Sequence, residues 1–208
     1  MQRLTGQSCH HNRGLLQGGG QVTPGVMTVT LDQRNDFSSL LASTTRAPEI
    51  PESADLYGWL CGSWDLDVLC YRGVNVAARG LRGEVHAARV LEGRAVQDVW
   101  IMPRYDERRL DSDPTMNMYG TTLRAWDAAT QSWRIAWTNP VRGHHEEQVG
   151  RWNGRDILQE GTRPDGTRTR WTFTDITADA FHWRGEALHP HQSAWTLEAE
   201  FVAKRRSS

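Results

Sequence analysis

Lysine and cysteine are almost absent from this chain of 208 residues. Lys204 is the only lysine, so arginine supplies every other basic side chain. The three cysteines, Cys9, Cys61 and Cys70, are too few for a disulfide framework, and none stands in a C-x-x-C pair that could hold a metal. We therefore expect unpaired thiols and no cysteine-based site.

The sequence also lacks an excess of charge of either sign. The formal net charge is -1, so the chain has no basic character that would attract nucleic acid or an anionic membrane. No apolar run approaches the roughly 20 residues that span a bilayer, and residues 1–25 lack the features of a secretory signal. These absences favour a cytoplasmic protein, and the preference for arginine is typical of a GC-rich, bacterial genome.

The amino-terminal quarter of the chain differs in composition from the rest. Residues 1–30 are rich in Gly, Gln, Thr and His and have too few apolar side chains to offset the entropy of ordering, so the sequence predicts disorder there. Met27 could then be the biological start. Residues 31–52 are expected to form a linker that holds one short helix around residues 36–42.

The main domain is predicted to span residues 53–206. It opens with a short helix over residues 53–61, where Leu56, Trp59 and Leu60 share one face. After Gly62 the hydrophobic period changes to two, which is typical of strands. The predicted strands cover residues 64–71, 81–91, 95–102, 119–126, 132–138, 145–152, 156–161, 167–176, 181–188 and 194–203.

Short turn signals separate these strands, among them Asn153-Gly154 and Pro164-Asp165-Gly166. Strands joined by short turns pair with their sequence neighbours, and closure of such a meander removes its exposed edges. The predicted fold is therefore all-β, an antiparallel up-and-down barrel of about ten strands with a short N-terminal helix. The one long insertion, residues 103–118, is expected to form a lid or loop at the barrel mouth.

Ten tryptophans are a heavy load for one domain, and alternation places many of them on inward faces. A barrel of about ten strands is wider than the eight-stranded kind, whose side chains can just fill it. The large rings could fill this lumen or line a ligand cavity, and the sequence leaves both open. The tryptophans expected as cavity walls are Trp100, Trp126, Trp137 and Trp183.

Polar residues interrupt the inward pattern at a few positions. Arg124 shares a face with Trp126, Asn139 follows Trp137 on its face, and Gln97 and Asp98 are adjacent, so that one of the two must point inward. Buried polar groups need partners, and we expect Arg124, Asn139 and Asp98 to act as polar anchors in the lumen.

A polar triplet alternates with aromatic residues near the end of the chain. His182, Arg184 and Glu186 form either a solvated outer face or a charge network in the lumen. In the second case Arg184 would bind a ligand, and Asp98, His182 and Glu186 would be candidate catalytic acids or bases.

Metal and nucleotide motifs are weak or missing. The adjacent His144 and His145 would point to opposite faces of a strand, and His189-Pro-His191 would need a third ligand from elsewhere. The sequence contains no Walker A loop, G-x-G-x-x-G, nucleophile elbow or H-E-x-x-H. No metal site is therefore expected.

Three short motifs resemble those of the calycin superfamily, which includes lipocalins, fatty-acid-binding proteins and nitrobindin-like barrels, and are most similar to uncharacterised bacterial calycin-like domains. The motifs are Leu60-Cys-Gly-Ser-Trp64, Gly120-Thr-Thr-Leu-Arg124 and Trp133-Arg-Ile-Ala-Trp137. The resemblance spans about 150 residues and implies an up-and-down barrel with a central cavity. It implies no single chemistry, because members bind lipids, pigments or haem and a few are enzymes.

The sequence predicts binding of a small apolar or aromatic metabolite, without a cofactor, in a Trp-lined cavity. Two alternatives stay open: a cofactor-free isomerase, cyclase or hydro-lyase, and a nitrobindin-like haem protein with His182 or His86 as the haem ligand. The expected partner is a small ligand rather than nucleic acid or a membrane, and a homodimer is left open.

Overall fold

Ten antiparallel strands pair in chain order and close on themselves in a computed structural model that describes residues 36–109 and 114–207. The barrel strands are β2 (Gly62–Tyr71), β4 (Arg82–Val90), β5 (Ala95–Met102), β6 (Met118–Asp127), β7 (Ser132–Asn139), β8 (His144–Trp152), β9 (Ile157–Thr162), β10 (Arg168–Thr174), β11 (Ala180–Leu188) and β12 (Thr196–Arg205). The predicted fold class is confirmed.

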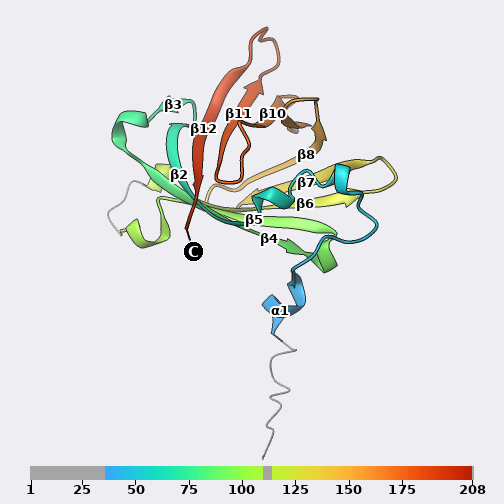
Figure 1. Cartoon of the computed structure of the whole chain (residues 1–208). Coiled ribbons are helices and arrows are strands. Elements are labelled where there is room, and N and C mark those ends of the chain that lie inside the picture. The colour runs from blue at the N-terminus through green and yellow to red at the C-terminus, as the bar shows by residue number, and fades with distance from the viewer. Residues whose placement is uncertain (1–35, 110–113, 208) are drawn as a thin grey trace, which may run out of the picture.

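Closure depends on β2, which pairs with β12 on one side and with β4 on the other. Figure 1 shows the last strand, β12, beside the first barrel strand, β2. The two-residue strands β1 (Ala42–Ser43) and β3 (Val74–Asn75) pair with β4 and β2 at the margins.

Alternation decides which side chains enter the barrel. On β11, for example, Phe181 and Trp183 are buried, whereas His182 and Arg184, which alternate with them, are only partly buried. The cross-strand register keeps inward residues opposite inward residues, as for Trp183 with Phe201 and Trp126 with Trp133. Each strand thus contributes one apolar row to a common interior.

The segment before β2 differs from its prediction. A single helix over residues 53–61 is wrong, because the chain forms two separate 3-10 turns, Glu52–Ala54 and Gly58–Leu60. Carbonyl groups that a helix would use internally accept hydrogen bonds from indole N–H groups instead: Trp59 donates to Leu56, Trp64 to Leu60 and Trp133 to Ala54. The earlier helix forms as expected, as α1 (Phe37–Leu41), and lies outside the barrel (Figure 1).

This segment packs one end of the barrel shut. Tyr57 and Leu60 are fully buried. The ring of Tyr57 lies 5.2 Å from Trp133, and Trp64 lies 4.9 Å from Phe181, both edge to face. Such aromatic pairs contribute about 0.5–1.5 kcal/mol each beyond the area they bury. The end that holds the β6–β7 and β10–β11 turns is therefore a solid aromatic core.

The insertion between β5 and β6 does not cover the mouth in its described part. The backbone N–H of Tyr105 donates to Glu84, and Arg104 pairs with Asp65, both on the outer face of the barrel. The strand order places the β5–β6 connection at the same end of the barrel as the β7–β8 and β9–β10 turns, as expected of a loop at the mouth. Residues 103–108 do not form a lid, because the carboxylates of β2 and β4 hold this segment on the outer wall.

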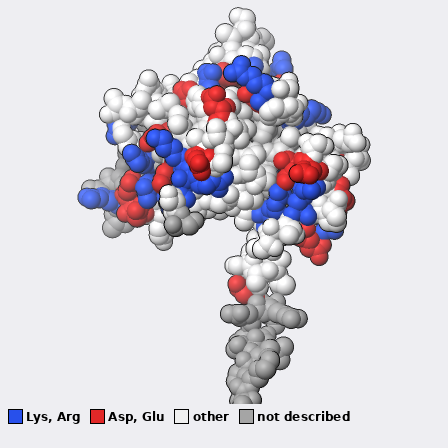
Figure 2. Space-filling model, in the orientation of Figure 1, with Lys and Arg blue, Asp and Glu red and all other residues white. Residues whose placement is uncertain are grey.

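Charges on the surface are mixed. Figure 2 shows acidic and basic side chains interspersed in small groups on the face in view. The expected disorder of residues 1–30 lies outside the described residues.

Candidate functional site

The half of the barrel opposite the packed end is hollow. It contains a cavity of about 860 Å³ that opens between the turns β7–β8, β9–β10 and β11–β12 and the end of β2. This volume lies within the usual range of small-molecule sites, about 300–1,000 Å³. Tryptophans therefore fill the lumen at one end of the barrel and line a cavity at the other.

The deep wall of the cavity is aromatic. Trp183 stacks on Phe201 at 5.1 Å and lies 5.7 Å from Trp100 and 5.6 Å from Trp171, while Trp137 lies 6.2 Å from Trp171. None of the four tryptophans exposes more than 8% of its surface. The rings thus hold one another in place and present only small parts of their surfaces to the space.

The two halves of the barrel differ in how their indole N–H groups are hydrogen-bonded. Each of the packed-end tryptophans Trp59, Trp64 and Trp133 donates to a backbone carbonyl. The cavity tryptophans donate to no residue in the described part of the chain, yet their nitrogens are not enclosed by protein. These are Trp100, Trp137, Trp171 and Trp183. Four hydrogen-bond donors therefore face the cavity.

A buried ion pair forms the polar part of the deep wall. Arg124, only 1% exposed, binds the Asp98 carboxylate through Nη1 and donates from Nε to Gln159 over 3.2 Å. Asp98 also accepts from the backbone N–H of Thr122 at 2.9 Å. The Arg124 guanidinium is therefore fixed in place and neutralised by Asp98.

Three polar groups of the cavity wall have no hydrogen-bond partner among the described residues. Thr122 and Arg124 both line the cavity, and neither the Thr122 hydroxyl nor Arg124 Nη2 has a partner among the described residues. Asn139, which is 3% exposed, lines the cavity nearer the rim, and its Oδ1 is buried with no hydrogen-bond partner there either. Buried polar groups are normally paired, so these unpaired atoms mark a place where a ligand or water can bind.

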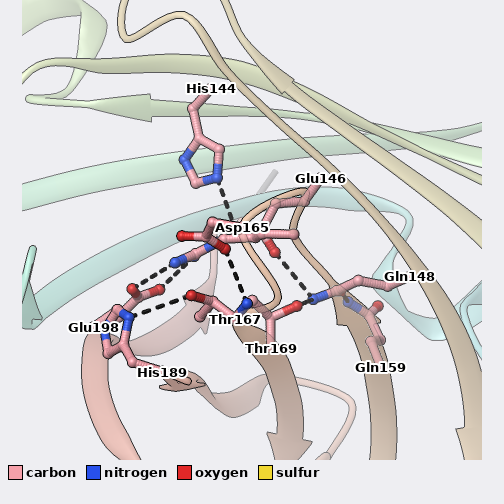
Figure 3. A network of polar contacts seen from close by, with 10 residues as sticks. His144, Glu146, Gln148, Gln159, Asp165, Thr167, Thr169, His189 and Glu198 are labelled. Carbon is pink, nitrogen blue, oxygen red and sulfur yellow. Dashed lines mark hydrogen bonds and ion pairs between the residues drawn. The ribbon is translucent and has the colours of Figure 1, made fainter. Parts of the chain in front are cut away.

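The rim is held by a charged network around Arg163. Figure 3 labels three other members of this network, His144, Glu146 and Glu198. The Arg163 guanidinium binds Glu146 through Nε at 2.9 Å and Nη2 at 2.5 Å, and binds Glu198 at 2.6 and 2.8 Å. His144 Nε2 lies 2.8 Å from the Glu146 carboxylate. This network joins β8, β12 and the β9–β10 turn, so it fixes the shape of the opening.

The surroundings of Glu146 favour its ionised form. Burial alone would raise the pKa, but the hydrogen bond with His144 and the charge of Arg163 outweigh it and lower the pKa below the ordinary value of 4.5. A carboxyl whose pKa is lowered on folding stabilises the fold above its unfolded pKa, and this contribution is lost as the pH falls through the folded value.

We expect Glu146→Gln to flatten the dependence of stability on pH below about 4.5. The measurement is urea unfolding of wild type and variant at pH 7 and at steps down to pH 3. Glu147→Gln is the matched control, because Glu147 is the next residue but its side chain is 82% exposed. An equal change in both variants would contradict the role given to Glu146.

Five of the seven residues expected to bind a ligand line the cavity: Trp100, Arg124, Trp137, Asn139 and Trp183. The expectation for Trp126 is wrong in place, since it lies at the packed end, 5.8 Å from Trp133. The expectation for Arg184 is also wrong in place, because it points outward toward Glu200 and Glu186.

The candidate catalytic residues do not meet. Asp98 lies in the deep wall, whereas His182 and Glu186 are on the outer face of β11. His182 lies 2.9 Å from Glu200, and Glu186 accepts from Arg170 at 2.8 Å. Because Phe181 and Trp183 point inward, the strand period sends their polar neighbours outward, which corrects the lumen alternative for His182, Arg184 and Glu186.

Sequence reasoning missed several cavity residues. Thr122, Trp171 and Phe201 were recognisable from alternation alone, because each shares a face with an inward aromatic or arginine residue. Glu146 and Arg163 had no such signal, since charged residues next to turns are usually solvated.

Neither a cluster of metal-ligand side chains nor a membrane-spanning helix occurs among the described residues. Within residues 36–109 and 114–207, no three His, Cys, Asp or Glu side chains are grouped so as to hold a metal ion, His189 and His191 included. No helix of the same residues has the length and apolarity needed to cross a membrane.

Comparisons with known proteins found little. No family model matches the sequence, and no curated protein matches it. Among solved structures, the S-type phycobiliprotein lyase CPES from Guillardia theta is similar over 75% of this chain and 93% of its own, with 10% identity and a TM-score of 0.42. So loose a likeness carries no argument about the present chain, although the closed antiparallel barrel itself fits the expectation of a calycin-type fold.

Proposed function

We propose that this protein is a calycin-like barrel that binds a small, largely apolar molecule with an aromatic or otherwise flat body. The observation that carries the proposal is the cavity of about 860 Å³, open at one end, with Trp100, Trp137, Trp171 and Trp183 in its wall. A mainly apolar pocket with a few fixed polar groups is the usual arrangement for holding and orienting a small ligand.

The packing of the rest of the barrel supports a single binding chamber. The opposite end is filled by Tyr57, Trp64, Trp133 and their aromatic neighbours, so a ligand has one way in and out. At that opening, Arg72 and Arg142 lie in the rim beside the fixed Arg163 network.

Binding is favoured over catalysis because Asp98, the one predicted catalytic residue at the deep wall, has both carboxylate oxygens occupied. A general base must reach the proton that it removes. The oxygens of Asp98 are taken up by Arg124 and by the backbone of Thr122, and His182 and Glu186 lie on the far side of the wall. The side chains of the deep wall therefore suit holding a molecule rather than proton transfer.

Haem is not supported by the histidines that the structure describes. His182 and His86, the expected ligands, are on the outer face, where His86 contacts Ser63 and Glu84. His144, His145 and His189 are at the rim, above the aromatic wall, and His144 is held by Glu146. The deep wall thus offers no histidine to a haem iron.

Titration with the neutral fluorescent probe N-phenyl-1-naphthylamine tests the proposal. We expect saturable binding by the wild type, with an affinity that falls about fivefold in Trp137→Leu, the effect of losing roughly 1 kcal/mol of aromatic contact. Trp126→Leu is the matched control. Because Trp126 lies at the packed end, this substitution should leave the affinity unchanged. Absence of probe binding, or an equal loss in both variants, would contradict the proposal. Native mass spectrometry of the freshly purified protein can then identify a retained ligand.

A further inference from the structure

The hydrogen-bonding groups that face the deep cavity are almost all donors. Four indole N–H groups and Arg124 Nη2 can only donate, and the Thr122 hydroxyl can donate as well. None of these groups has a partner among the residues that the structure describes, whereas three indoles of the packed end, those of Trp59, Trp64 and Trp133, each donate to a backbone carbonyl. Unpaired donors are thus concentrated in the hollow half of the barrel, although the buried Tyr57 hydroxyl at the packed end also has no partner among the described residues.

Acceptors in the same space are few. The carboxylates of Glu146, Asp165 and Glu198 lie at the rim. Arg163 binds Glu146 and Glu198, and Asp165 accepts from the Thr167 backbone N–H. Asp98 is bound by Arg124 and by the Thr122 backbone. Asn139, near the rim, has a side-chain amide that can both donate and accept hydrogen bonds.

The deep site is also electrically neutral. The Asp98 carboxylate cancels the positive charge of Arg124 while leaving Nη2 free to donate. A ligand carboxylate placed there would meet the buried negative charge of Asp98 as well as the guanidinium, and its desolvation would not be offset. A neutral oxygen acceptor meets the same donors without that cost.

We infer that the ligand is a neutral, flat aromatic compound that carries carbonyl oxygens, of the chemical class of aromatic ketones and quinones. Its ring lies among Trp100, Trp137, Trp171 and Trp183, and its oxygens accept hydrogen bonds from the free indole N–H groups, from Arg124 and from Thr122. This inference rests on the proposed binding function and deepens it by naming the ligand class. An unmet donor in a pocket discriminates strongly, because a ligand that lacks the matching acceptor leaves the donor unpaired.

Three tricyclic probes that differ at one carbon test the inference: fluorene, 9-fluorenone and fluorene-9-carboxylate. Each is titrated as a competitor of N-phenyl-1-naphthylamine bound to the full chain. We expect 9-fluorenone to bind about tenfold more tightly than fluorene, because one or two hydrogen bonds to its carbonyl account for a difference of that size. It should also bind more tightly than fluorene-9-carboxylate. Equal affinities for ketone and hydrocarbon, or a preference for the carboxylate, would overturn the ligand class.

Variants assign the effect to the donors. Thr122→Val removes one donor with little change of shape, and Trp137→Phe removes one donor together with one of the two rings of the indole. Each should weaken 9-fluorenone binding about three- to tenfold relative to fluorene, which reports the loss of ring contact alone. Trp133→Phe is the matched control: its indole donates to Ala54 at the packed end, so the variant should lower stability and leave the ratio of the two affinities unchanged. If the ratio moves equally in all three variants, the donor assignment is overturned. If neither the fluorescent probe nor any tricycle binds the wild type, the proposed function itself fails.

Discussion

Replacing Arg124 by leucine is expected to lower the free energy of unfolding by about 3–5 kcal/mol, the usual cost of leaving one partner of a buried ion pair without the other. Asp98 would stay buried in the wall with only the Thr122 N–H as a partner, and Gln159 would lose its donor as well. The total free energy of unfolding of a folded domain is about 5–15 kcal/mol, so this loss is a large fraction of it. The measurement is urea unfolding followed by far-UV circular dichroism.

The double variant Asp98→Asn/Arg124→Leu separates the buried charge from the loss of packing. An asparagine at position 98 can still accept from the Thr122 backbone but carries no charge, so we expect the double variant to recover at least half of the lost stability. If Arg124→Leu unfolds at the same urea concentration as the wild type, or if the double variant is less stable than the single one, the ion pair does not have the structural role described.

The architecture was predictable because two signals agreed along the chain. Period-two alternation set the inward rows, and short turns forced each strand to pair with the next one, so that closure into ten strands followed. The same alternation placed Trp137, Trp183 and Arg124 correctly in the cavity wall. These signals are local, which is why one sequence suffices to read them.

The division of the barrel into a packed and a hollow half was not predictable in this way. Trp126 and Trp137 look alike in the sequence, each inward and each on a strand next to a turn. They differ because the segment around Tyr57 folds into one end and supplies carbonyl partners to the tryptophans there, while nothing in the described chain fills the other. That choice depends on a contact between residues about eighty positions apart, such as Ala54 with Trp133. Alternation carries no information about such a contact.

The orientation of His182, Arg184 and Glu186 stayed open for a different reason. A ligand cavity can hold charged groups, so a polar row opposite an aromatic row does not by itself reveal which one faces inward. The structure decides it through neighbouring strands: Glu200 of β12 and Arg170 of β10 offer partners on the outer face. The charges therefore pair across strands on the outside, while Trp183 and Phe201 lie opposite each other on the inward face.

Enlarging Gly185 is expected to close the cavity. Gly185 lies inward on β11, and the ring of Trp183 lies against it: a Cβ at this position would be 2.6 Å from Cη2 and 3.1 Å from Cζ3 of Trp183, and 3.4 Å from Cδ1 of Trp171. All three nearest atoms belong to side chains that border open space. The rings can therefore move, and the direction left to them is into the hollow half of the barrel.

We expect Gly185→Val to weaken binding of N-phenyl-1-naphthylamine by about thirtyfold or more, which corresponds to roughly 2 kcal/mol of overpacking in the occupied site, and Gly185→Ala to have a smaller effect. Stability should change less than affinity, because the displaced rings enter a cavity rather than a packed core. Gly120→Ala provides the contrast: a Cβ there would meet Trp137 and also the Thr138 carbonyl at 2.8 Å, so both stability and affinity should fall. The double variant Trp183→Phe/Gly185→Val should regain part of the lost affinity, since the smaller ring relieves the clash. If it binds no better than Gly185→Val, displacement of Trp183 is not what closes the site.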